Sequence, residues 1–324
     1  MKRILTFFIL LLSMKVGYSA TNYTKGWAEV RELISKGNYR TANEKAQGLF
    51  DAARTEQNSF RILQGAVMLS QAEGSYQEDT TQKALDRYCS IEGSLNETDE
   101  ALRCIYLAEA YQHYYDWNAW AIRRNLPLEE PTDDIAQWDE KTFQDTIRAL
   151  QDKVLADADA LKRTPVAGYA EMLEMGNKAG QTLCPTLYDV VVNNILNYDR
   201  ADNDDETVQA LFEEDALYGT AKEFCSLSLP DKPEIPLVHN LTLLQELTRF
   251  HLNDKNADAL RRTLDEKRLD FIRHHAFFEK VRYREGLERL VEAYKLSDGI
   301  TARQNTGPSS QKKMRIALAT TNRR

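Results

Sequence analysis

The sequence predicts an all-α protein, built as an irregular array of antiparallel helical hairpins with no substantial β-sheet. From Tyr23 onward, apolar residues recur at steps of three and four, the spacing of one face of an α-helix. Runs in which Val, Ile or Thr alternate with polar residues, as in a half-buried strand, are nearly absent. Short turns containing Gly and Asn separate the apolar periods, which allows consecutive helices to fold back on one another.

The first hairpin is expected from Tyr23 to about Ala53, with Gly37 and Asn38 between its helices. This turn, with Ala42 behind it, is similar to the corner of a tetratricopeptide hairpin, where a small residue lets two helices pack closely. No regular period of about 34 residues follows, so the array is expected to be irregular. The first helix is marked by Trp27, Val30, Leu33 and Ile34, and the second by Tyr39, Ala42, Ala46, Leu49, Phe50 and Ala53.

The same spacing predicts further helices along the chain. A loop with Pro127, Pro131, Asp133 and Asp134 interrupts them, and Pro185 is expected at the first position of a later helix. Three segments before that proline are marked by Phe60, Leu63 and Val67, by Leu102, Ile105, Ala108, Tyr111 and Tyr115, and by Phe143, Ile147, Leu150, Val154, Ala158 and Leu161. The segment after it is marked by Leu187, Val190, Val191 and Ile195.

Two interruptions suggest a domain boundary. Residues 199–206 hold five acids in eight positions, as expected of a solvated turn, and residues 229–236 hold three prolines, whose rings oppose helix continuation. We therefore expect a helical-hairpin domain over 21–228, a Pro-rich linker over 229–236 and a helical segment over 237–298. Residues 299–324 are polar and basic and lack periodicity, so they are expected to form a disordered tail.

The first 20 residues have the pattern of an export signal. Lys2 and Arg3 precede an apolar run from Ile4 to Leu12, and small residues up to Ala20 offer a cleavage site. The run is too short for an ordinary transmembrane helix, and no later run approaches membrane length. The chain is therefore expected to be exported and soluble, in the periplasm or on the outer surface of a Gram-negative bacterium.

The formal net charge of the whole chain is −8. Residues 1–20 contribute three bases and no acid, which leaves −11, and the last 24 residues contribute six bases and no acid, so residues 21–300 total −17. An acidic body of this kind repels phosphate groups, which argues against nucleic acid and anionic lipid as ligands. A well-solvated surface accounts for the same charge.

Four cysteines in an exported chain permit disulfides. Cys89 and Cys104 flank the turn-like stretch Gly93–Asn96, so a bridge between them is possible if they end one helix and begin the next. Buried free thiols are the alternative, and no pairing is predicted for Cys184 with Cys225.

The sequence lacks the motifs of the common enzyme classes, so we expect no catalytic residue, no cofactor and no metal site. Neither G-x-S-x-G nor H-E-x-x-H is present, nor is a phosphate-binding glycine loop. His274 and His275 are adjacent, and on a helix they would point about 100° apart, which does not suit a shared metal.

Two groups of acidic residues could suggest a calcium site or a glycosidase site, but local structure accounts better for both. Asp202, Asp204, Glu206 and Glu213 imitate the ligand spacing of an EF-hand, but Thr207 stands where that loop needs Gly. Neighbouring acids such as Asp133 and Asp134 seldom face a sugar from opposite sides, as an all-α glycosidase would require, so helix capping before residues 138–143 is expected instead.

The densest feature is the aromatic stretch from Tyr111 to Trp120, followed by Arg123 and Arg124. As a functional site it would be a platform for a sugar or an extended peptide, formed by Tyr114, Trp117, Trp120 and Arg123. As structure it would be the wide core face of a central helix, which we favour because large aromatic side chains are mostly buried.

Several short motifs, in order, resemble the helical N-terminal region of large exported alpha-2-macroglobulin-like proteins of Bacteroidetes. The resemblance covers roughly residues 23–295. It is carried by Trp27–Ala42, by Leu107–Tyr111 with Tyr114, Tyr115, Asn118, Trp120, Ile122 and Arg124, by Trp138, Asp139 and Phe143, and by Pro185–Asp189.

In that family the helical region precedes many β-sandwich domains that act as a protease trap, and some members carry a Cys-Gly-Glu-Gln thioester. This chain contains neither that tetrapeptide nor sandwich-like strands. The resemblance therefore implies a helical interaction or scaffold module, a truncated member lacking the trap, whose partners are other proteins or the missing macroglobulin domains. The alternative is a periplasmic carbohydrate- or peptide-binding helical protein that uses the aromatic platform.

Overall fold

The computed structural model describes residues 21–76, 80–128, 132–156, 158–173, 178–197, 206–255, 257–275 and 280–294. Within these ranges it has fourteen α-helices, three short 3-10 helices and no strand, apart from an isolated β-bridge between Pro165 and Thr186. The prediction of an all-α fold is confirmed. The predicted signal (1–20) and basic tail (299–324) lie outside the described residues, as do Asp202 and Asp204.

The N-terminal part consists of α1 (Tyr23–Ser35), α2 (Tyr39–Glu56), α3 (Ser59–Gly74) and α4 (Thr81–Ser90). α1 ends where predicted, because Gly37 adopts a left-handed conformation (φ 74°) that lets the amides of Gly37 and Asn38 bond back to Ile34 and Leu33. Helices α2 and α3 also pack closely where they cross. A Cβ on Gly65 of α3 would lie 3.1 Å from the Cα of Phe50 in α2. These are helical hairpins, while the likeness to tetratricopeptide repeats stays a prediction.

The central part contains the longest helix, α5 (Glu97–Ile122), which packs along α6 (Glu140–Ala156). Asn96 caps α5 by accepting a hydrogen bond from the amide of Asp99 at 2.9 Å. Between the two helices lies η1 (Ile135–Gln137), and after them come α7 (Asp159–Arg163), η2 (Val166–Tyr169), α8 (Lys178–Leu183) and α9 (Leu187–Asn197).

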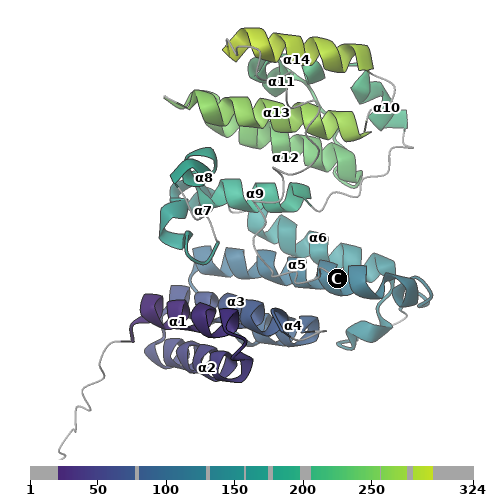
Figure 1. The fold of residues 1–324 in the computed structure, drawn as a ribbon. Coiled ribbons are helices and arrows are strands. Elements are labelled where there is room, and N and C mark those ends of the chain that lie inside the picture. Colours follow the sequence, from purple (N-terminus) through teal and green to yellow (C-terminus); the bar gives the residue numbers. More distant parts are fainter. Residues whose placement is uncertain are drawn as a thin grey trace, which may run out of the picture.

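The C-terminal part contains α10 (Glu206–Phe212), η3 (Asp215–Tyr218), α11 (Ala221–Ser226), α12 (Pro236–His251), α13 (Asp258–His275) and α14 (Lys280–Tyr294). Figure 1 shows the helices stacked broadly in chain order, from α1 and α2 at one end to α13 and α14 at the other, with α5 and α6 across the middle. One cluster of buried apolar side chains runs through the stack, from Tyr23 to Leu290.

Residues 229–235 of the predicted linker lie between two helices that pack on each other, α11 and α12, and Pro236 is the first residue of α12. Gln245 of α12 donates hydrogen bonds to the carbonyls of Phe224 and Leu227 at 2.7 and 2.8 Å. Arg148 of α6 reaches the carbonyl of Pro233 at 3.2 Å. The helices on either side of the Pro-rich segment are therefore joined by direct contacts, and the division into domains there stays a prediction.

Two local predictions are wrong. α9 begins at Leu187, not at Pro185, because Thr186 donates its amide and hydroxyl to the Asp189 carboxylate and takes the capping place. The helix expected to continue to Leu161 is two helices, since α6 ends at Ala156 and α7 packs on α9.

The capping role expected of the pair Asp133–Asp134 before residues 138–143 is found for Asp134, at η1, while a different acid caps α6. Asp139 accepts the amide of Thr142 at 2.7 Å, whereas Asp134 caps the short η1 through the amide of Ala136. Asp134 also accepts the side chain of Gln137 at 2.8 Å. The pair Asp133–Asp134 therefore includes a residue whose carboxylate is used for local structure.

Candidate functional site: the exposed end of helix α5

Helix α5 changes environment along its length. Residues from Leu102 to Ala110 are buried nearly all round, because α4, α6, α7, α9 and α3 all contact this helix. After Tyr115 the only buried residue of α5 is Ile122. The C-terminal end of α5 thus keeps one face on the protein and presents the other to solvent.

The inner face of this end carries a cluster of aromatic rings centred on Phe143 of α6, which is fully buried. Tyr114 stacks on Phe143 with ring centroids 5.7 Å apart, and Tyr111 stacks on Trp138 at 5.3 Å. The indole N–H of Trp138 donates to the carbonyl of Thr132 at 2.8 Å. The core interpretation of the aromatic stretch holds for these side chains.

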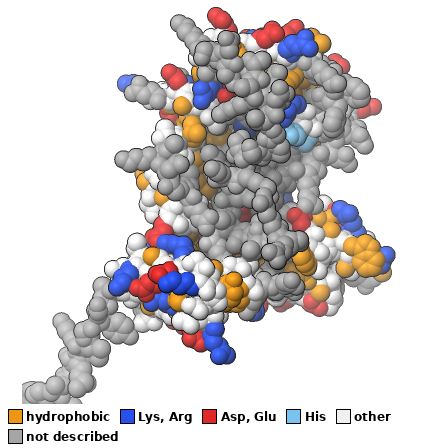
Figure 2. Space-filling model, in the orientation of Figure 1, with side chains coloured by type: hydrophobic (Ala, Val, Ile, Leu, Met, Phe, Trp, Pro, Cys, Tyr) orange, Lys and Arg blue, Asp and Glu red, His pale blue; other side chains and the backbone are white. Residues whose placement is uncertain are grey.

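The outer face carries two tryptophan side chains that are exposed to solvent. Trp117 is 68% exposed and Trp120 is 72% exposed, and Leu126, just beyond the helix, is 82% exposed. Figure 2 shows hydrophobic side chains next to basic ones at the outer edge of the molecule in this region. Trp117 and Trp120 are three residues apart on a helix, so they lie on the same face.

The two arginines after Trp120 are held in different ways. The guanidinium of Arg124 lies over the ring of Trp120, 3.5 Å from its centroid. Arg123 Nε is 3.7 Å from the carboxylate of Glu140, which also accepts the hydroxyl of Tyr115. Burial and this bond to Glu140 raise the pKa of Tyr115, so its hydroxyl stays protonated and donates.

A polar side chain fixes the turn that follows α5. Asn125 Nδ2 donates to the carbonyls of Ala136 and Trp138 at 2.9 and 2.8 Å. This ties the residues directly after the helix to the segment that enters α6. We call the surface formed by Trp117, Trp120, Arg123, Arg124 and Leu126 the α5 tip.

The structure divides the four residues of the predicted platform. Trp117 and Trp120 are exposed together, Arg123 borders them while paired with Glu140, and Tyr114 belongs to the inner cluster. The prediction did not include Arg124 and Leu126. Helical spacing points to Arg124, four residues after Trp120, but the sequence gives no signal for Leu126, which follows the end of the helical pattern.

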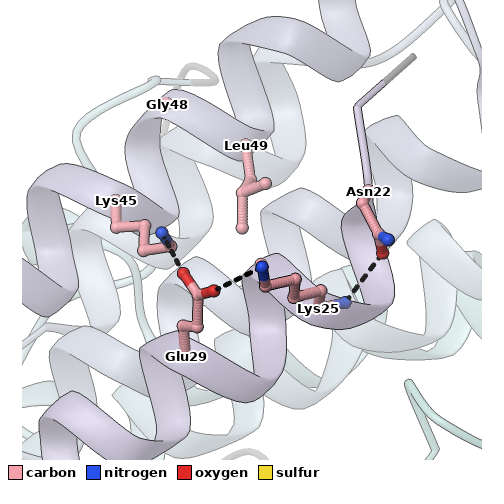
Figure 3. Close-up of a pocket in the computed structure, with 7 residues that line it drawn as sticks. Asn22, Lys25, Glu29, Lys45, Gly48 and Leu49 are labelled. Carbon is pink, nitrogen blue, oxygen red and sulfur yellow. Dashed lines mark hydrogen bonds and ion pairs between the residues drawn. The ribbon is translucent and has the colours of Figure 1, made fainter. Parts of the chain in front are cut away.

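A groove of about 410 Å³ lies between α1 and α2. Figure 3 shows Lys25 and Lys45 both pointing to Glu29, with Leu49 and Gly48 above this group in the view. The hydrogen bond and charge of Lys45 lower the pKa of Glu29, so the carboxylate neutralises much of the positive charge in the groove. The groove therefore lacks the concentrated charge of an anion site.

The other polar candidates are structural. His274 Nδ1 lies 2.6 Å from the carbonyl of Asp270, one turn earlier in α13, and His275 packs on Phe271. Among the residues that the structure describes, no group of three or more His, Cys, Asp or Glu side chains is placed to hold a metal ion. The four cysteines are free thiols, so the bridge between Cys89 and Cys104 is not formed in the structure.

A largely buried polar cluster lies between α9, α12 and α13 and includes Cys184, just after α8. His251 lies between two carboxylates, with Nε2 2.8 Å from Asp189 and Nδ1 2.7 Å from Asp254, and both His251 and Asp189 are only 1% exposed. Nearby, Asn193 donates to the sulfur of Cys184 at 3.9 Å and accepts from Lys267.

These buried groups are poorly suited to reaction with a substrate from solvent. Burial lowers the pKa of Lys267 to about 8 and raises the pKa of the Cys184 thiol, which keeps the sulfur protonated and unreactive. His251 and Asp189 have almost no contact with solvent. We therefore take the α5 tip as the candidate functional site.

Comparison with known protein families, with curated proteins and with solved structures finds no match to this chain. No helix in the described ranges is both long and apolar enough to cross a membrane.

Proposed function

We propose that this chain is an exported helical interaction module that binds a protein partner through the α5 tip. The observation that carries the proposal is the exposure of Trp117 and Trp120 on one helix face. Tryptophan and arginine are the residue types most enriched among those that dominate binding energy in protein interfaces. Leu126 adds apolar area, and a partner that covers these side chains would remove it from water.

The resemblance to the helical N-terminal region of Bacteroidetes alpha-2-macroglobulin-like proteins supports the same kind of role. The all-α fold agrees with that of a helical region, and the quoted motifs lie on α1, α2, α5, α6 and α9 or directly beside their ends. A scaffold that contacts other proteins, or further macroglobulin domains, fits a stack of helices that exposes two tryptophans on one helix face. The compartment proposed with it is the periplasm or the outer surface of a Gram-negative cell.

Affinity capture from periplasmic extract tests the proposal, with the full chain, the double variant W117A/W120A and the control V281A. Val281 is a suitable control because it is 67% exposed on α14, far along the stack from α5. We expect specific proteins to be retained by the full chain and by V281A and lost with W117A/W120A. Circular dichroism checks that each variant keeps its helix content. Retention of the same proteins by W117A/W120A would count against the α5 tip as the site.

The second candidate, a carbohydrate-binding protein, is favoured by the same pair of indoles, since sugar rings stack on exposed aromatic faces. The test is a fluorescence titration with oligosaccharides. Trp27 is buried and Trp138 is packed in the aromatic cluster, so a sugar at the tip should change only the signal of Trp117 and Trp120. A saturable change that disappears in W117A/W120A would support this function, and an unchanged spectrum would exclude the sugars tested.

A further inference from the structure

We propose, on the basis of the proposed function, that the partner segment at the α5 tip is acidic, with a carboxylate next to a bulky apolar side chain. The chemistry of the tip is the starting point. It combines two basic side chains with three large apolar ones: Arg123, Arg124, Trp117, Trp120 and Leu126.

Arg124 is oriented before any partner binds. Its guanidinium lies over Trp120 at 3.5 Å, and such a stack uses the flat face of the group while its N–H donors point outward in the plane. That edge matches a carboxylate, which can accept two parallel hydrogen bonds from one guanidinium. Because the stack already restricts the side chain, less conformational entropy is lost on binding.

The bulky apolar side chain expected in the partner segment is inferred from Trp117 and Leu126. Both side chains are more than two-thirds exposed, at 68% and 82%. Trp117 lies on the same helix face as Trp120, over which the guanidinium of Arg124 is held. A partner side chain that covers Trp117 while its neighbouring carboxylate meets Arg124 would use both halves of the tip.

Charge favours a protein segment over a lipid surface. A single carboxylate complements Arg124, since Arg123 is already paired with Glu140, but an anionic membrane would also face acids near the tip. Asp116 is exposed and is held by Gln112 Nε2 at 2.7 Å, and Glu140 lies beside Arg123.

The Arg124–Trp120 stack also argues against a neutral sugar. A sugar ring needs an open aromatic face, and the guanidinium covers one face of Trp120. A carboxylate needs only the exposed edge of that guanidinium. The same geometry thus favours an anionic group at this position.

The test begins with peptide display on the immobilised full chain, with W117A/W120A as counter-selection. We expect enriched peptides to contain Asp or Glu beside Phe, Trp, Tyr, Leu or Met. The strongest peptide is then synthesised and titrated into the full chain and into R124Q, R124K and V281A. R124Q should weaken binding about ten-fold or more, since it removes a charge-assisted hydrogen bond, and R124K should weaken it less. V281A should bind as the full chain does.

A salt titration and a vesicle-binding assay provide two further tests. Binding of the peptide should weaken as NaCl rises from about 0.05 M to about 0.5 M, because the tip and the carboxylate are exposed to screening. Vesicles of phosphatidylcholine with phosphatidylglycerol should not bind the chain. Vesicle binding that is lost in W117A/W120A would overturn the inference in favour of a lipid surface.

The outcomes separate this inference from the proposed function. Enriched peptides that are neutral or basic, and that need Trp117 and Trp120 but not Arg124, would overturn the acidic motif while leaving the tip as a protein-binding site. Peptides that bind W117A/W120A as well as the full chain, or no enrichment at all, would overturn both. Circular dichroism of R124Q establishes that lost binding is not lost folding, which is expected because Arg124 is exposed.

Discussion

At the scale of single residues, buried charges in this protein lie against partners on the same or a neighbouring element. His251 contacts Asp189 of α9 and Asp254 just after α12. Arg268 lies 3.0 Å from Asp265 and donates to the carbonyl of Gly219 at 2.5 Å. Buried charges without such partners would be strongly unfavourable, so these contacts help fix how the helices are placed.

Stability should depend on the protonation of His251. Burial alone would lower its pKa, but the hydrogen bonds and charges of Asp189 and Asp254 outweigh burial, and the pKa is raised. A raised folded-state pKa means stability that is fully present below the unfolded value of about 6.5 and lost as pH rises through the folded value. The difference in free energy of unfolding between the protein and H251Q should therefore shrink from about pH 6 to about pH 9, as measured by urea unfolding.

Asp189 supplies the control for this prediction. D189N leaves His251 without one of its two acidic partners and should destabilise the fold by about 3–5 kcal/mol, the usual cost of breaking a buried pair. It should also flatten the pH dependence. A pH-independent difference between the protein and H251Q would show that His251 contributes by packing and not by charge.

The four thiols should differ in reactivity. Cys89 is exposed, whereas Cys104 and Cys184 are buried, and burial raises the pKa of these two buried thiols. Under native conditions an alkylating reagent should modify Cys89 first, and Cys104 and Cys184 only after denaturation. Peptide mass spectrometry measures this order. Protection of both Cys89 and Cys104, with a loss of two hydrogen atoms reversed by reductant, would instead establish the bridge predicted from the sequence.

At the scale of helices, close approach depends on glycines at the crossings. A Cβ at Gly65 of α3 would meet the ring of Phe50 at 2.8 Å and its Cα at 3.1 Å, and the backbone atom cannot swing aside. Gly48 of α2 has nothing within 4 Å of such a Cβ. The two glycines have the same chemistry and opposite surroundings.

The substitutions G65A and G48A should therefore have opposite effects. G48A gains helix propensity and should stabilise the protein by about 0.5–1 kcal/mol. G65A gains the same propensity but forces α2 and α3 apart, which should cost about 1–3 kcal/mol. Thermal unfolding followed by circular dichroism measures both. Equal shifts of the two variants would contradict the packing seen at α2 and α3.

At the scale of the whole molecule, the packed core determines how the chain should unfold. The apolar cluster runs from Tyr23 to Leu290 without a break at residues 229–236. Gln245, after the Pro-rich segment, donates hydrogen bonds to carbonyls that precede it, and Arg148 donates one to the carbonyl of Pro233 within it. A continuous core of this kind favours cooperative unfolding over separate melting of 21–228 and 237–298.

The positions of the tryptophans make this testable. All four of them, Trp27, Trp117, Trp120 and Trp138, precede residue 229, so fluorescence reports on the N-terminal part and circular dichroism on all helices. We expect the two urea transitions to coincide. Q245A, which removes the bonds from α12 to the end of α11, should begin to separate them. A second circular dichroism transition with no fluorescence counterpart in the unmutated protein would support two domains.

Much of the fold could be predicted because the buried face of a helix appears in the sequence as apolar residues three or four positions apart. Trp27 and Val30 mark α1, and Gly37 marks its end, as the structure confirms. The errors arise where a local contact decides the outcome. Thr186 and Asp189 form the cap that displaces the start of α9 from Pro185.

The sequence by itself determined that this chain is helical, because each helix satisfies its own backbone hydrogen bonds and needs only an apolar stripe to pack. Only the tertiary structure decided which aromatic side chains face inward. Tyr114 and Trp117 differ by three positions on one helix, yet Tyr114 stacks on Phe143 while Trp117 stays in water. The reason is that burial depends on whether a neighbouring helix covers the face, and α6 covers only one side of the end of α5.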